Sequence, residues 1–127
     1  MRSGDRRLTT EPISVNQVRL VGRISGDPEA RELPSGTVLV GFRLVVARSA
    51  TPMALGSRHS SDWVECAAWG GRVRAQARAW RNGDHVEVTG ALRRRFGGQQ
   101  RGWSRLEVEV LSGRRLRKAR AGESAHG

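Results

Sequence analysis

Two tryptophans six residues apart, Trp63 and Trp69, stand in a segment with the residue types of a β-strand. Side chains an even number of residues apart in a strand lie on one face of the sheet, so both indole rings share a face with Glu65. The opposite face carries small and apolar residues that suit a core, namely Val64, Cys66 and Ala68. This pattern predicts two exposed rings on which nucleic-acid bases can stack whatever their sequence.

The charge of the chain supports this prediction. The 127 residues include 23 Lys and Arg against 12 Asp and Glu, a net charge of +11, and all but one of the cations are Arg. A large basic excess is typical of proteins that bind polyanions, and Arg suits phosphate contacts and stacking on bases. Solvated surface charge is the alternative for the basic excess, and a core position is the ordinary place for a lone Trp in a strand.

Other kinds of chemistry lack the residues they need. His59, His85 and His126 are too scattered to predict a zinc site with each other or with the one cysteine. Glu107 and Glu109 share a strand face, where we expect solvated charges beside Arg residues and no acid/base pair. We also find no phosphate-binding loop and no nucleophile motif. The sequence therefore predicts no enzyme activity, metal, cofactor or small-molecule substrate.

The chain length predicts one domain. We expect a flexible N-terminal arm over residues 1–12, a folded domain over 13–112, and a disordered basic tail over 113–127. A lone Cys66 excludes an internal disulfide and fits a reducing compartment. No run of about 20 apolar residues predicts a membrane span, and the first residues do not resemble a secretion signal. We therefore expect a cytoplasmic location.

Period-two alternation predicts five strands that position these residues. The first has inward Val18, Leu20 and Ile24 and ends at a turn, Gly26-Asp27-Pro28. The second spans 38–46, and the third is the tryptophan strand, preceded by a long exposed loop over 47–61. A fourth strand has an inward row that ends at Leu92, and a fifth has an inward row of Leu106, Val108 and Val110.

One helix is predicted between the third and fourth strands, because Val73, Ala77 and Trp80 follow a helical period. We expect Trp80 to lie in the core. The order β-β-β-α-β-β predicts an all-β protein, a five-stranded OB-fold barrel with one short helix between strands 3 and 4, in which closure removes the exposed sheet edges.

Six segments of the chain together resemble the bacterial-type single-stranded DNA-binding protein family. They cover about residues 14–112 in order and at compatible spacing: 16–23, 27–31, 35–46, 63–70, 82–93 and 105–110. The resemblance implies an OB-fold, non-catalytic coating of single-stranded DNA in replication, recombination or repair, association with the nucleoid, and assembly as a homo-oligomer, with a tetramer favoured over a dimer.

The resemblance also implies roles for individual residues. Trp63 and Trp69 match base-stacking positions, and three basic residues match positions near the bound strand, namely Arg81, Arg93 and Arg95. The segment with Asn16, Val18 and Leu20 matches the edge strand that pairs across the subunit interface. A further stacking ring of the family is replaced here by Arg48-Ser49-Ala50, which leaves Phe96 and Trp103 as alternatives for a third ring. The basic end differs from the family's acidic, partner-recruiting tip and favours an accessory paralogue or a mobile-element version over the essential replication protein.

The sequence thus favours sequence-tolerant binding of single-stranded DNA. The tryptophans would stack bases, and five Arg residues would neutralise phosphates, namely Arg43, Arg48, Arg81, Arg93 and Arg95. Two alternatives stay open. One is an OB-fold adaptor whose subunit contacts are its function. The other is an RNA-binding OB domain, since no feature of the sequence indicates whether the 2′-hydroxyl of RNA is recognised or excluded.

Overall fold

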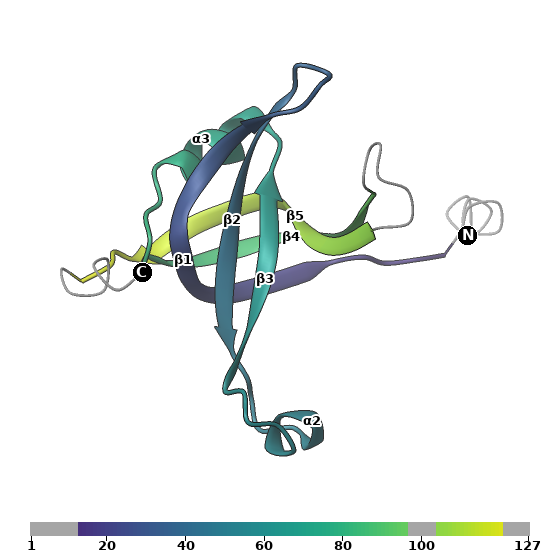
Figure 1. Cartoon of the computed structure of the whole chain (residues 1–127), viewed down its shortest axis with the longest axis vertical. Coiled ribbons are helices and arrows are strands. Elements are labelled where there is room, and N and C mark those ends of the chain that lie inside the picture. Colours follow the sequence, from purple (N-terminus) through teal and green to yellow (C-terminus); the bar gives the residue numbers. More distant parts are fainter. Residues whose placement is uncertain (1–12, 97–103, 121–127) are drawn as a thin grey trace, which may run out of the picture.

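A closed barrel of five strands makes up the body of the molecule (Figure 1). The computed structural model describes residues 13–96 and 104–120. Around the barrel the strand order is β1-β2-β3-β5-β4, and the elements are β1 (Val18–Glu32), β2 (Val38–Ala47), α2 (Pro52–Leu55), β3 (Ser61–Ala68), α3 (Gly71–Arg78), β4 (His85–Phe96) and β5 (Ser104–Arg117). The predicted OB-fold, with one helix between strands 3 and 4, is confirmed. The predicted exposed loop over 47–61 also contains α2.

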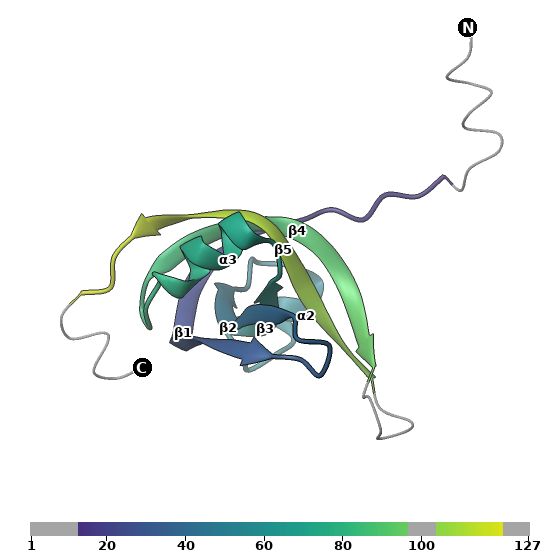
Figure 2. The same ribbon diagram turned by 90° about the horizontal axis from the view of Figure 1, so that it is seen from above.

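The core fills the barrel and extends beneath α3. Inward residues of the period-two rows, such as Leu44 and Val88, have no exposed surface. In Figure 2, α3 lies across one end of the barrel, where Val73, Ala77 and Trp80 join the core cluster. The Trp80 ring meets Phe42 edge to face at 5.5 Å between centroids, a favoured arrangement for aromatic pairs. The prediction that Trp80 belongs to the core is confirmed, whereas Trp63 and Trp69 lie outside the core cluster.

Two glycines allow the strands to cross closely where the barrel closes. A Cβ added to Gly90 of β4 would lie 1.8 Å from the carbonyl oxygen of Glu109 in β5. A Cβ added to Gly22 of β1 would lie 2.3 Å from the carbonyl oxygen of Val45 in β2. Both distances are far inside contact range, so any side chain at these positions would push the strands apart.

The first strand does not end where the sequence predicts. β1 continues to Glu32 through an irregularity between Ser25 and Glu29, so the expected turn at Gly26-Asp27-Pro28 is a bend within one strand. Gly26 has a positive φ of 82°, which glycine adopts without strain. Its N–H donates to Asn82 Oδ1 at 2.7 Å, and the Asn82 N–H donates to Asp27 Oδ1 at 2.8 Å. These bonds hold the bend against the segment that leads into β4.

The β4–β5 hairpin extends beyond the other strands (Figure 1). Leu92 and Leu106 were expected to face inward, but they are 42% and 50% exposed. They belong to the same alternating rows as Val88 and Val108, which are buried. The alternation is therefore right, but past the end of the barrel the inner side of the hairpin has no core to cover it.

The end of β5 also differs from the prediction. Residues 113–117 were expected in a disordered tail, yet β5 runs to Arg117 and pairs with β4 as far as His85. Beyond the strand, the Ala119 N–H donates to Asp84 Oδ1 at 2.8 Å. Asp84 is 3% exposed and also accepts from the Arg81 N–H. The first part of the basic segment is thus held against the barrel, while the arm over 1–12 and residues 121–127 lie outside the described residues.

Candidate nucleic-acid interface

Trp63 lies on the outer face of the β2–β3 ladder and is 61% exposed. Arg43 and Glu65 are direct partners in the same ladder, and Arg43 Nη2 lies 2.9 Å from Glu65 Oε2. The Arg43 guanidinium also lies over the indole ring, with its Cζ 4.3 Å from the ring centroid. The predicted exposure of Trp63 is confirmed, and its ring stacks with an arginine that a glutamate holds in place.

Trp69 follows directly after β3 and is half-buried. Arg95 Cζ lies 5.5 Å from the centroid of its ring, and Arg95 Nη1 lies 2.7 Å from Glu107 Oε2. Glu107 is 5% exposed, so the expectation of a solvated charge is wrong for this residue. The carboxylate of this β5 residue is paired across the hairpin with Arg95 of β4. An open hollow of about 260 Å³ lies here, lined by Trp69, Arg93, Arg94, Arg95, Glu107 and Glu109.

Two more of the predicted phosphate ligands are paired with carboxylates. Arg93 Nε donates to Glu109 Oε1 at 2.8 Å. Arg48 donates twice to Asp62, from Nη2 to Oδ1 at 2.7 Å and from Nε to Oδ2 at 3.0 Å. These hydrogen bonds lower the pKa of Asp62 and raise that of Arg48. The Asp62 carboxylate therefore stays ionised and paired with Arg48 at neutral pH.

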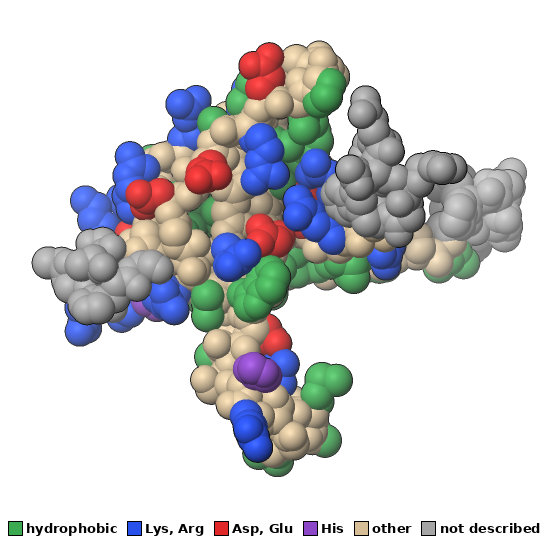
Figure 3. Space-filling model, viewed as in Figure 1, with side chains coloured by type: hydrophobic (Ala, Val, Ile, Leu, Met, Phe, Trp, Pro, Cys, Tyr) green, Lys and Arg blue, Asp and Glu red, His purple; other side chains and the backbone are tan. Residues whose placement is uncertain are grey.

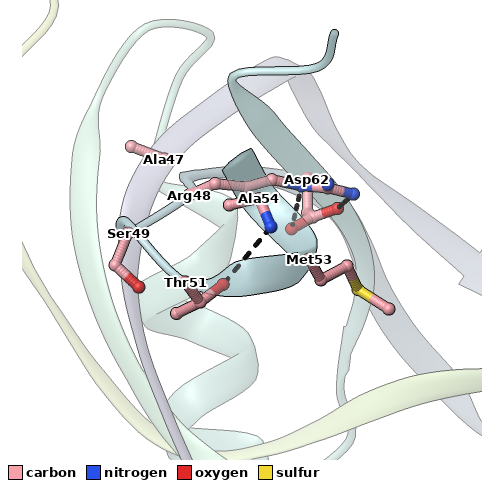
Figure 4. A pocket seen from close by; sticks show the side chains of 7 residues that line it. All are labelled: Ala47, Arg48, Ser49, Thr51, Met53, Ala54 and Asp62. Atoms are coloured by element: carbon pink, nitrogen blue, oxygen red, sulfur yellow. Dashed lines mark hydrogen bonds and ion pairs between the residues drawn. The ribbon is translucent and has the colours of Figure 1, made fainter. Parts of the chain in front are cut away.

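The Arg48 pair closes the base of the loop that carries α2 (Figure 4). The Arg48 N–H donates to the Ser60 carbonyl, and the Thr51 side chain accepts from the Ala54 N–H to cap α2. In Figure 4 the Arg48 and Asp62 side chains meet above this cap. The role of Arg48 visible in the structure is to join the two ends of the loop.

The remaining predicted site residues are Arg81, Phe96 and Trp103. Arg81 donates from Nη1 to the carbonyls of Arg78 and Trp80, each at 2.8 Å, and so covers the end of α3. Phe96 ends β4 and is 72% exposed at the end of the hairpin. Trp103, the other alternative for a third ring, lies outside the described residues.

On this surface the predicted cations alternate with acids. Each of Arg43, Arg48, Arg93 and Arg95 has a carboxylate partner. The sequence prediction missed these partners, although the outward rows of β2 and β3 place Arg43 opposite Glu65. Figure 3 shows acidic side chains between basic ones in the centre of this view, and basic side chains gathered over α3 and the nearby end of β5. A phosphate must therefore compete with a carboxylate for these arginines.

The predicted interface residues in the first strand have contacts within the chain. The Asn16 side chain donates to the Leu92 carbonyl at 2.7 Å and accepts from the Leu92 N–H at 2.8 Å. It extends the β1–β4 ladder by one step, as a backbone group would. Val18 and Leu20 are partly buried and pack against the core, which confirms the inward face predicted for this strand.

Three further findings concern the described residues. No group of three or more His, Cys, Asp or Glu side chains in them is arranged to hold a metal ion. No helix in this part of the chain has the length and apolar character needed to cross a membrane. Cys66 is buried, and burial raises the pKa of its thiol to about 12, so the thiol stays protonated at neutral pH.

Comparison with known proteins places this architecture in a family. Residues 15–115 match the model of the single-strand binding protein family. The single-stranded DNA-binding protein A of Bacillus subtilis is 33% identical over 96 residues, which are 76% of this chain and 55% of that protein. The chain thus spans about half the length of this relative.

A solved structure has the same fold. The SSB of Plasmodium falciparum, determined in complex with ssDNA, matches with a TM-score of 0.66 and 19% identity over 84% of this chain and 97% of that one. Because the family model covers most of the chain, the resemblance noted in the sequence is confirmed. The chain belongs to the single-strand binding protein family.

Proposed function

We propose that this protein binds and protects single-stranded DNA, with little regard to base sequence, during replication, recombination or repair. The observation that carries the proposal is the exposed Trp63 ring with Arg43 stacked on it, on the outer face of β2 and β3. Exposed aromatic rings beside cations suit stacking of successive bases with their phosphates close by. The names of the relatives, which mention single-stranded DNA, support the same class of ligand.

In this proposal the protein acts by binding and catalyses no reaction. Trp63 and Trp69 are the proposed stacking residues, and either Phe96, which is exposed at the end of the hairpin, or Trp103 is proposed to add a third ring. Arg43, Arg48, Arg81, Arg93 and Arg95 are proposed to lie along the path of the strand. The site of action we propose is the cytoplasm, at the nucleoid.

The test is a fluorescence titration of the purified protein with three ligands of equal length: oligo(dT), the matching oligo(U), and a DNA duplex. We expect oligo(dT) to quench the emission and bind most tightly. Equal or tighter binding of oligo(U) would favour an RNA-binding domain instead. No binding of any of the three would leave the adaptor function as the better hypothesis.

We also propose that the protein is a homo-oligomer, a tetramer by resemblance to its family. The β1–β4 ladder covers Val18–Arg23 and the β1–β2 ladder covers Arg23–Glu32. Among the described strand pairs, the Val18–Gly22 half of β1 therefore has a neighbour on one side. Such an edge is able to pair with another chain, and Val21 within it is 41% exposed.

A further inference from the structure

We infer that Arg95 is a positioning residue, fixed by Glu107 so that it orients the Trp69 ring, and that Arg43 supplies the phosphate contact on the tryptophan face. Arg43 and Arg95 thus have different roles, although the sequence analysis predicts phosphate contacts for both. The inference rests on the proposed binding of single-stranded DNA and deepens it. It also predicts which of the two residues makes the binding sensitive to salt.

An arginine that turns to bind a phosphate leaves its carboxylate partner. Water must then hydrate that carboxylate in the arginine's place. The Glu65 side chain is 30% exposed, so water can replace Arg43 there. The Glu107 side chain is 6% exposed, and a buried carboxylate without its partner is strongly destabilising. Arg43 is therefore free to exchange its partner, whereas Arg95 is bound in place.

The side chains of Arg43 and Arg95 also differ in exposure. The Arg43 side chain is 47% exposed and the Arg95 side chain 27% exposed. Arg43 thus presents more of its surface to a ligand that arrives from solvent. Arg95 lies between Glu107 on one side and the Trp69 ring on the other, and both neighbours reduce its contact with solvent.

Strand pairing does not fix the backbone at Trp69. The last β3 residue in the β2 and β5 ladders is Ala68, so Trp69 lies just past the pairing that fixes the backbone. Its ring is half-buried beside the hollow between the hairpin and β3. Arg95, anchored from below by a buried charge, is the contact that sets the angle of this ring. Trp63 differs because it lies within the ladder, opposite Val45.

The test compares Arg43→Gln, Arg95→Gln and the double variant Arg95→Gln/Glu107→Gln with wild type. Arg94→Gln is the control for loss of one charge, since Arg94 is the chain neighbour of Arg95 and donates to the hydroxyl of Ser104. Binding of oligo(dT) is measured from low to high NaCl, and melting is measured for each variant. We expect Arg43→Gln to reduce the log–log salt slope by about 0.7, the value for one phosphate contact on a single strand, with an unchanged melting temperature.

For Arg95→Gln we expect the wild-type salt slope and a lower melting temperature, because Glu107 loses its partner. The double variant removes the buried charge with its partner and should recover the melting temperature. A stable fold alone should not restore the ring orientation. Quenching of Trp69 fluorescence by oligo(dT) is measured in a Trp63→Phe background, and Trp63→Phe/Trp69→Phe is the blank. In this background we expect the quenching to stay reduced in Arg95→Gln/Glu107→Gln.

A salt slope reduced as much by Arg95→Gln as by Arg43→Gln would overturn the inference. Full Trp69 quenching in the double variant would overturn the positioning role. If wild type does not bind oligo(dT) at all, the proposed function fails and so does the phosphate role of Arg43. The anchoring of Arg95 by Glu107 would still be decided by the melting temperatures of the single and double variants.

Discussion

At the scale of single residues, Trp63, Trp69 and Trp80 have different environments. Trp80 is 3% exposed in the core, whereas Trp63 is 61% exposed on the outer sheet face. Strand parity predicted the exposed Trp63, because Cys66 and Ala68 identified the inward side of β3, and the helical period predicted the buried Trp80. Parity could not predict the arginines that stack on the rings, since this contact depends on the neighbouring strands.

We expect Trp63→Ala to weaken binding of oligo(dT) by about 1–3 kcal/mol, the usual loss for one stacked base. Its melting temperature should stay near that of wild type because the ring is mostly in solvent. Titration and thermal melting test both points. Trp80→Ala is the contrasting variant, since removing a buried aromatic side chain costs about 3–5 kcal/mol of folding stability. A large fall in the melting temperature of Trp63→Ala would mean that the ring is structural.

At the scale of elements, the sequence predicts the strands well and their ends poorly. The alternating rows identify all five strands, because each strand covers one side of a common core. The bend at Gly26 was read as a turn because glycine and proline mark both features. The end of β5 was missed because Arg114, Arg115 and Arg117 read as tail, whereas in the structure they have partners on the neighbouring chain segments.

Glu87 joins three strands and predicts a pH dependence. Its carboxylate in β4 is paired with Arg114 of β5 and with Arg19 of β1. The hydrogen bond from Arg114, and then that from Arg19, lowers the pKa of Glu87. Because the pKa in the folded state lies below the unfolded pKa of about 4.5, the ionised carboxylate stabilises the fold at pH values above the unfolded pKa. This contribution is lost as the pH falls through the folded pKa.

We therefore expect Glu87→Gln to melt at a lower temperature than wild type at pH 7 and to lose less on acidification from about pH 5 to pH 3. Thermal melts across this range measure the effect. Arg114→Gln should flatten the acid limb in the same sense, because it removes the largest cause of the shift. Parallel acid limbs for wild type and Glu87→Gln would show that this carboxylate does not stabilise the barrel.

Truncation distinguishes the held part of the basic segment from the rest. Deleting residues 113–127 removes four paired positions of β5 and the Ala119 and Arg115 contacts to buried Asp84. We expect a loss of about 3 kcal/mol in unfolding free energy, since a buried charge is left without its partner. Deleting residues 121–127 alone is the control, since it keeps all of these contacts. Urea denaturation of both truncated proteins provides the comparison, and equal stability would contradict the docking of residues 113–120.

At the scale of the whole molecule, the chain has a net charge of +11, yet Arg43, Arg48, Arg93 and Arg95 near the tryptophans are each paired with a carboxylate. The arginine and carboxylate pairs there nearly cancel, while basic side chains gather over α3 and the end of β5 (Figure 3). Composition alone could predict a polyanion partner. It could not predict that the stacking face is close to neutral, because that depends on the strand register.

The open half of β1 leads to a prediction for the assembly. We expect wild type to give an oligomeric mass in light scattering at micromolar concentration. Val21→Lys should shift this mass toward the monomer, because a charge beside the open edge opposes pairing of two strands. Val45→Lys, on the outer face of β2, is a matched control for which no shift is expected. A monomeric wild type would remove the oligomer proposal and leave the DNA-binding proposal in place.

Closing the barrel through β1 and β4 has a consequence for how the chain folds. The partners Val18 and Gly90 are 72 positions apart in the chain, and Asn16 reaches further still to Leu92. Pairing of such distant segments slows folding. During synthesis on a ribosome, β1 has to wait until β4 emerges, and its edge stays unpaired until then. Until β1 and β4 pair, this edge is therefore open to misassembly with neighbouring chains on the same messenger RNA.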